Sequence, residues 1–313
     1  MSALAVLDPG LLTTIQDLGR PGYLRYGVPP SGPADREAFV LANRLVGNPD
    51  TAAGLECTLV GPTLEVRTAC LIAATGAEMP VTVNGSEVPR WTPVRLKAGD
   101  TLRLGTAPRG VRAYLAVFGG IQVPPVLGSR ATYLRGQLGG LEGRQLRKGD
   151  LLPLGQPARS LDGGERHRVR AECIPSYAGE PQVRVVLGPQ ADRFTPEGVR
   201  AFLDGPYQML PQSDRMGARL MGPRITHTRG HDIISDGIPL GGIQVVGDGQ
   251  PIVLLVDRQS TGGYTKIATV CSFDIGRVGQ VRPGQRLRFR RISVNEAHAV
   301  LRIERARLET AVV

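Results

Sequence analysis

Aromatic side chains are scarce in this chain of 313 residues, where they make up only 4% of the sequence. Proteins that bind single-stranded nucleic acid stack bases on aromatic rings, and this composition offers little of such a surface. Long apolar runs are absent too, since no stretch approaches the roughly 18 residues of a membrane-spanning helix. Residues 1–9 lack the basic start and the apolar core of a signal peptide. We therefore expect a cytoplasmic protein without a membrane span.

Closely spaced cysteines are also missing. The chain has four cysteines, and no two of them form a CxxC pair: Cys57, Cys70, Cys173 and Cys271. This spacing favours buried thiols in a reducing compartment over a disulfide framework or a zinc site.

Several motifs of well-known active sites do not occur. Residues 136–140 are rich in glycine but lack the Lys-Ser/Thr pair of a phosphate-binding loop. The chain has no GxSxG sequence, so a hydrolase of the nucleophile-elbow type is not supported. His227 and His231 lie four residues apart, but Gly230 and the strand-like context favour structural histidines over a helical metal pair. We expect no metal site in this chain.

The net charge of +10 raises the question of nucleic-acid binding. The arginines are spread along the chain, and the densest run, at residues 165–170, lies in a segment that we expect to be a linker. A nucleic-acid surface needs a clustered basic patch. The charge instead favours a small anionic substrate or an acidic partner, which it can steer towards the protein.

Short strands bounded by glycine and proline are the main feature that the sequence does contain. The chain has 41 glycines and 25 prolines. Apolar runs at residues 183–187 and 252–256 are typical of buried strands. Asn84-Gly85 follows one short strand and precedes another, which predicts a tight hairpin.

Helices are expected at only a few places. Ser31 or Asp35 can cap a helix that ends at Gly47, since apolar residues recur there at helical spacing. Thr195 followed by proline predicts a second, short helix that ends near Gly205.

Two short sequence motifs recur along the chain. GGIQV occurs at residues 119–123 and 241–245. A turn with glycine followed by an alternating strand occurs at residues 96–104, 146–154 and 281–289, and the glycine suits a position with positive φ. The repeats favour a mainly β fold of two related barrel-like lobes. The expected parts are an N-terminal lobe over residues 1–160, a linker over 161–180 and a C-terminal lobe over 181–313.

Polar residues gather in an N-terminal segment with many glycines and prolines, residues 13–35. Its side chains could converge on a ligand: Gln16, Asp17, Arg20, Ser31 and Asp35. A tied-down loop in which Asp17 pairs with Arg20 explains the same residues, because polar groups of loops usually satisfy the backbone.

Two further polar segments lie in the C-terminal half. Ser213, Asp214 and Arg215 offer donors, acceptors and a positive charge that could hold a carboxylate or phosphate. An Asp-capped turn with a surface arginine is the alternative. Residues 257–266 follow the most apolar strand, and polar loops at strand ends often carry function. Lys266 in this loop could polarise an oxygen or hold an anion.

Taken in order, these segments resemble the family of the 5-oxoprolinase C subunit, also known as allophanate hydrolase subunit 2 or the biotin-dependent carboxyltransferase domain family. The resemblance extends from about Leu7 to Arg305. The matching segments are residues 13–23, 42–48, 128–130, 213–217 and 257–266.

The resemblance implies two cyclophilin-like β-barrel lobes with few short helices. It also implies a heteromer with a kinase-inhibitor-like B subunit, and with an A subunit. Such complexes open 5-oxo-L-proline to L-glutamate with hydrolysis of ATP, which makes the expected activity that of an ATP-dependent amidohydrolase. We expect ATP, with Mg²⁺ as its counter-ion, at the interface with the B subunit.

The resemblance together with the polar segments gives a set of expected site residues. Lys266, Asp214 and Arg215 are expected to form the catalytic group. The expected substrate-binding residues are Gln244, Arg258, Ser31, Asp35, Ser213 and Gln16.

Two other functions fit the same resemblance. One is the carboxyltransferase component of a biotin-dependent urea or amide carboxylase. The other is a regulator without catalysis that antagonises a histidine-kinase inhibitor. Val246, Ser260 and Thr265 depart from the residues common in the family, which leaves the substrate open.

Overall fold

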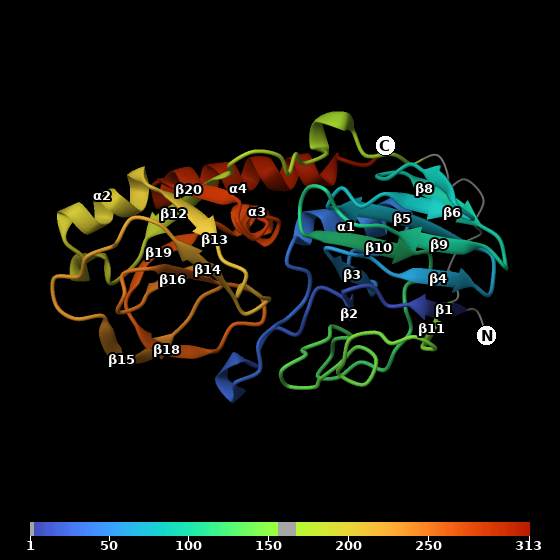
Figure 1. The fold of residues 1–313 in the computed structure, drawn as a ribbon, viewed down its shortest axis with the longest axis horizontal. Coiled ribbons are helices and arrows are strands. Elements are labelled where there is room, and N and C mark those ends of the chain that lie inside the picture. Colours follow the sequence, from blue (N-terminus) through green and yellow to red (C-terminus); the bar gives the residue numbers. More distant parts are fainter. Residues whose placement is uncertain (1–2, 156–166) are drawn as a thin grey trace. The chain divides into compact units, whose positions relative to one another are not determined.

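The chain folds into a mainly β protein with four α-helices in the residues described here, 3–155 and 167–313 of a computed structural model (Figure 1). It divides into two compact units. The first unit comprises Met1–Arg20, Ser31–Ser176 and Ala306–Val313, and the second comprises Pro21–Pro30 and Tyr177–Arg305. Each unit therefore contains sequence from outside the lobe boundaries that we expected. Residues 161–166 of the expected linker lie outside the described residues.

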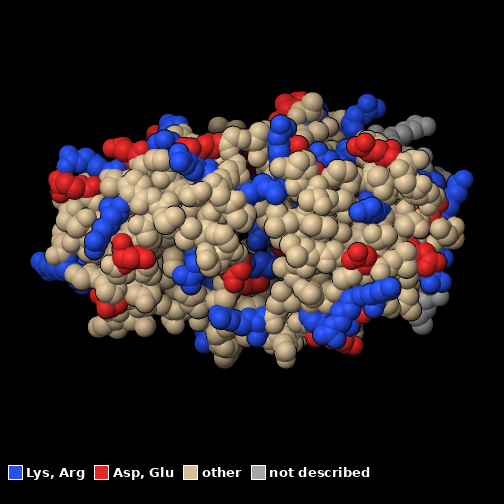
Figure 2. All heavy atoms as spheres, viewed as in Figure 1, with Lys and Arg blue, Asp and Glu red and all other residues tan. Residues whose placement is uncertain are grey.

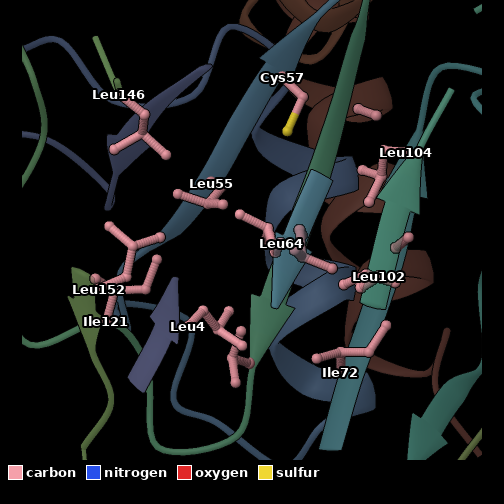
Figure 3. Packing of buried hydrophobic residues seen from close by; sticks show 14 of the residues in the cluster. Leu4, Leu55, Cys57, Leu64, Ile72, Leu102, Leu104, Ile121, Leu146 and Leu152 are labelled. Atoms are coloured by element: carbon pink, nitrogen blue, oxygen red, sulfur yellow. The ribbon is translucent and has the colours of Figure 1, made fainter. Parts of the chain in front are cut away.

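Two antiparallel sheets build the first unit. Their orders are β11-β1-β4-β9-β6-β7 and β2-β3-β10-β5-β8. The strands are β1 Ala3–Asp8, β2 Leu12–Gln16, β3 Gly54–Thr58, β4 Thr63–Val66, β5 Cys70–Gly76, β6 Val81–Val83, β7 Ser86–Val88, β8 Pro93–Leu96, β9 Thr101–Leu104, β10 Arg112–Val117 and β11 Leu151–Pro153. Inward-facing side chains of both sheets share one core, as Figure 3 shows for Leu4, Leu55, Leu64, Leu102 and Leu152.

Local sequence signals of the first unit are confirmed. Val81–Val83 pairs with Ser86–Val88 across Asn84 and Gly85, which both have positive φ as a two-residue hairpin requires. Helix α1 spans Arg36–Leu45, and the Asp35 carboxylate accepts a hydrogen bond from the amide of Ala38. Of the two expected caps, Asp35 is therefore the one used.

A closed barrel forms the second unit, in the strand order β12-β19-β16-β17-β14-β13-β20. Its strands are β12 Gln182–Leu187, β13 Pro206–Met209, β14 Gly217–Met221, β16 Gly242–Val245, β17 Pro251–Leu254, β19 Lys266–Val270 and β20 Arg286–Arg291. Strands β15 (Asp232–Gly237) and β18 (Thr261–Tyr264) pair only with each other and make a two-stranded ribbon outside the ring. Figure 1 draws this ribbon at the lower edge of the unit.

The remaining helices are α2 Pro196–Asp204, α3 Ile275–Gly279 and α4 Val294–Glu309. The prediction for α2 is confirmed, since the Thr195 hydroxyl accepts from the amide of Gly198 and the helix stops before Gly205. Among the helices in the described ranges, none has the length and apolar character needed to cross a membrane.

The recurring turn motif at residues 96–104, 146–154 and 281–289 has the same local structure in all three copies. Its glycines have φ angles of 89°, 92° and 84° at Gly99, Gly149 and Gly284. The next side chain accepts a hydrogen bond from the amide three residues before it: Asp100 from Lys97, Asp150 from Arg147 and Gln285 from Arg282. The expected positive φ is confirmed in all three copies, and the motif serves both units.

On the face of the molecule shown in Figure 2, charged side chains of both signs are interspersed. Lys and Arg side chains lie apart from one another there, with Asp and Glu between them (Figure 2).

All four cysteines are free and buried, as expected. Burial raises the pKa of the Cys57 thiol to about 12 and that of Cys70 to about 12. Because the thiolate is the reactive form, both thiols are inert at neutral pH.

We expect the native protein to react only slowly with a thiol-specific chromogenic disulfide, and all four thiols to react after unfolding in denaturant. Rapid labelling of the native protein at Cys57 or Cys70, mapped by mass spectrometry, would contradict this burial.

Candidate functional site

Lys266 is a buried lysine at the first position of β19. Its side chain is 3% exposed, and its Nζ lies 3.3 Å from Oδ2 of Asp236, a side chain that is 56% exposed. The contact is a long ion pair, since Nζ makes no hydrogen bond to the described residues. A buried ammonium group with so little compensation is costly. An anionic ligand beside Lys266 would therefore compensate its buried charge.

Gln244 lies directly across from Lys266 in the barrel. The two residues pair in the register of β16 and β19, and the Gln244 side chain is buried. Its Nε2 is 3.5 Å from the carbonyl oxygen of Tyr264, a weak hydrogen bond. A Cβ atom at Gly262 would come within 2.7 Å of that Nε2, so a larger residue there would have to displace the Gln244 side chain. The second GGIQV copy therefore lies beside the end of the segment 257–266.

Arg258 is a second buried cation in this unit. Its Nε donates to the carbonyl oxygen of Ile238 at 3.0 Å, and Nη1 lies 3.5 Å from that of Leu255. Within the described part of the chain, no carboxylate forms an ion pair with it. Burial lowers the pKa of the Arg258 guanidinium. Neither Arg258 nor Lys266 has a buried counter-ion among the described residues. Both belong to the same unit as the amide of Gln244.

Arg215 differs from these two cations because its charge is neutralised. Nε lies 2.8 Å and Nη2 3.3 Å from the two carboxylate oxygens of Asp257, and both residues are buried. Asp214 accepts hydrogen bonds from the amides of Met216 and Gly217, and is exposed. Ser213 accepts from the amide of Arg219. The segment at 213–215 thus forms an Asp-capped turn, and its arginine is buried.

The expected site residues of the N-terminal segment all lie in the first unit. The amide of Gln16 bonds Thr14 and the carbonyl oxygen of Thr132, and its oxygen accepts from the amide of Gly32. Asp35 caps α1. Ser31 is different, because it is buried at a φ of 57° and its Oγ has no partner among the described residues. Strained backbone of this kind clusters at functional sites.

A buried carboxylate that the sequence did not reveal holds this segment in place. Oε2 of Glu56 accepts from the amide of Ala34 and from the Tyr114 hydroxyl, each at 2.9 Å. The same hydroxyl accepts from the amide of Asp35 at 2.8 Å. Nε of Arg112 lies 3.6 Å from the other Glu56 oxygen. Burial and the Glu56 charge raise the pKa of Tyr114, so its hydroxyl stays protonated and donates.

Three residues near Lys266 were also missed: Asp236, Gln190 and His227. Gln190 accepts from the backbone amide of Lys266 at 3.3 Å, and Nε2 of His227 lies 2.9 Å from the hydroxyl of Thr265. Burial and the neighbouring His231 lower the pKa of His227, which favours the neutral ring. No local motif marks Asp236 or Gln190, and the sequence favours a structural role for His227. Among the described residues, no three His, Cys, Asp or Glu side chains gather to hold a metal ion.

The match to known sequences defines the class of this protein. Residues 26–291 match the family described as carboxyltransferase domain, subdomain A and B, and the chain belongs to that family. It is 39% identical to the C subunit of 5-oxoprolinase from Escherichia coli over 296 residues, which cover 94% of this chain and 93% of that one.

Longer relatives contain the same domain. The chain is 37% identical to the urea amidolyase of Lachancea kluyveri, covering 98% of this chain but 18% of that protein. The crystal structure of the K. lactis urea amidolyase superposes with a TM-score of 0.93 at 35% identity, covering 98% of this chain and 20% of that one. The expected family and mainly β fold are thereby confirmed.

The buried Tyr114 hydroxyl predicts a measurable cost of its removal. Tyr114→Phe leaves the amide of Asp35 without its acceptor and takes one donor from the Glu56 carboxylate. We expect a loss of about 2–3 kcal/mol in the free energy of unfolding, measured by urea denaturation. Tyr207→Phe is the matched control, since that hydroxyl serves only backbone carbonyls, and its loss should cost about 1 kcal/mol. A smaller loss at position 114 than at 207 would show that the network does not stabilise the fold.

Proposed function

We propose that this chain is the C subunit of a bacterial ATP-dependent 5-oxoprolinase. The complex would convert 5-oxo-L-proline, ATP and water to L-glutamate, ADP and phosphate. The observation that carries the proposal is the end-to-end correspondence with the C subunit of the Escherichia coli 5-oxoprolinase, 93% of which is covered. The buried cations of the second unit support it, because 5-oxoproline is an anion at neutral pH.

The substrate presents two groups that these residues can recognise. Its carboxylate suits the unneutralised charge of Arg258 or Lys266, since buried charges need a partner. Its lactam offers one N–H and one carbonyl oxygen, and the Gln244 amide can pair with either. Arg215, fixed on Asp257, and the turn at Asp214 would then shape the loop beside the substrate.

Opening an unstrained lactam is uphill near neutral pH, which is the chemical reason for coupling to ATP. Transfer of the γ-phosphoryl group to the lactam oxygen activates the ring carbon. Water then adds to that carbon, and the ring nitrogen takes a proton as its bond to carbon breaks, which leaves an acyl phosphate. A second water hydrolyses the acyl phosphate to the carboxylate of glutamate and free phosphate. Phosphoryl transfer builds negative charge that a cation must face. Lys266 is the residue that we assign to this role.

The partners follow from the same proposal. They are the A subunit and the kinase-inhibitor-like B subunit. Both would assemble with this chain in the cytoplasm to complete the enzyme. Because the sequence has no phosphate-binding loop, ATP with Mg²⁺ would bind at the interface with the B subunit.

The test of the proposed function is to purify the chain with the A and B subunits and to measure glutamate release from 5-oxo-L-proline. No ATP-dependent release with all three present would overturn the proposal.

The two GGIQV copies supply a matched pair of variants. Gln244 is buried opposite Lys266, whereas Gln122 is exposed and bonds the carbonyl oxygen of Gly119 and the side chain of Arg130. Losing an amide that contacts the substrate costs about 1–3 kcal/mol of transition-state binding. Gln244→Ala should therefore lower kcat/KM of the assembled enzyme by about tenfold or more. Gln122→Ala should leave it near wild type, and equal losses would mean that the copies do not differ in role.

A second candidate is the carboxyltransferase component of a urea carboxylase. The TM-score of 0.93 with the K. lactis urea amidolyase favours it. This chain spans about a fifth of that protein, so the biotin carboxylase and the biotin carrier would be separate chains. Mixing those proteins with this chain and measuring ATP-dependent, urea-dependent phosphate release separates the candidates. Activity there, without glutamate release from 5-oxoproline, would establish the second function.

A further inference from the structure

The ribbon of β15 and β18 carries a carboxylate to the buried lysine. Asp236 lies near the end of β15, where it pairs with Gly262 of β18. The ribbon stands outside the seven-stranded ring, and most residues of β15 are exposed. A two-stranded ribbon without a core of its own opens at low free-energy cost. The counter-ion of Lys266 thus comes from an element of low local stability, while Lys266 itself lies in the barrel.

The geometry of this ion pair is that of a loose contact. Nζ and Oδ2 are 3.3 Å apart, whereas the buried pair of Arg215 and Asp257 in the same unit closes to 2.8 Å. Asp257 is 5% exposed, but Asp236 is 56% exposed. When Asp236 withdraws, water solvates its exposed carboxylate at once, so the cost falls on Lys266 alone, and an incoming anion can offset it. Withdrawing Asp257 would leave two buried charges without a partner.

Asp236 remains a charged partner under ordinary conditions. The backbone amide of Gly237, followed by Lys266, lowers the pKa of its carboxyl group. The amide of Gly237 donates to Oδ1 at 2.7 Å, while Oδ2 is the oxygen that faces Nζ. Oδ1 therefore stays anchored within β15, while Oδ2 faces Lys266. The side chain of Gln190 also contacts this carboxylate.

We propose that Asp236 is the displaceable counter-ion of Lys266. Its carboxylate occupies the place beside Nζ that the anionic group of the substrate takes on binding, and it moves out with the ribbon when the substrate enters. The identity of that anion as 5-oxoproline rests on the proposed function. Asp236 is thus a positioning residue, which holds the buried Lys266 side chain in place before the substrate arrives.

A matched pair of variants on the ribbon tests the displacement. Asp236→Asn and Asp232→Asn each remove one negative charge from β15, but Asp232 contacts His231 instead of Lys266. We expect 5-oxo-L-proline to bind the full-length Asp236→Asn chain at least about threefold more tightly than Asp232→Asn, measured by isothermal titration calorimetry. The reason is that the ligand no longer competes with a carboxylate. Equal or weaker binding in Asp236→Asn would overturn the displacement.

A second readout needs no substrate. Acetic anhydride is a small neutral reagent, and mass spectrometry gives its rate of reaction at Lys266. We expect this rate to rise in Asp236→Asn and to stay at the wild-type value in Asp232→Asn. An unchanged rate in Asp236→Asn would overturn the counter-ion role, whatever the substrate is. A raised rate in a chain that binds no 5-oxoproline, alone or with its partners, would keep that role and count against the proposed substrate.

Discussion

A closed barrel has no free edge along which a strand can slip, so the register of each strand pair is fixed by all the others. In the second unit this constraint sets Gln244 of β16 opposite Lys266 of β19. The pairing contains an irregularity between Ile243 and Gln244, and such irregularities re-aim side chains beside functional sites. The closure of the barrel therefore determines where the amide and the ammonium group lie.

The second unit compensates its buried cations to three different degrees. Arg215 is paired with the buried Asp257, and Arg258 is held by backbone carbonyls. Among the described residues, the ammonium group of Lys266 forms an ion pair only with the exposed Asp236. Since an incompletely compensated charge destabilises the folded protein, Arg258 and Lys266 reduce stability where Arg215 does not. A fold accepts such a cost at sites that bind charged ligands.

Sequence patterns predicted the features that depend on neighbouring residues. The hairpin at Asn84, the capped helices and the turns with positive φ all follow from short-range backbone chemistry. Contacts between distant strands had no such signal. Glu56 and Tyr114 look like ordinary strand residues, although they form a buried network. Asp236 looks like a loop carboxylate, and its contact with Lys266 depends on how the ribbon is placed against the barrel, which no local pattern encodes.

The division of the chain also sets an order of assembly during synthesis. Ala306–Val313 belongs to the first unit but is translated after Tyr177–Arg305, which makes up most of the second. Within the first unit, Val312 bridges Val169, and the carbonyl oxygen of Leu308 accepts from Arg44. The ribosome thus delivers the whole barrel before the residues that complete the earlier unit. Until residues 306–313 are synthesised, Val169 and Arg44 therefore lack these partners.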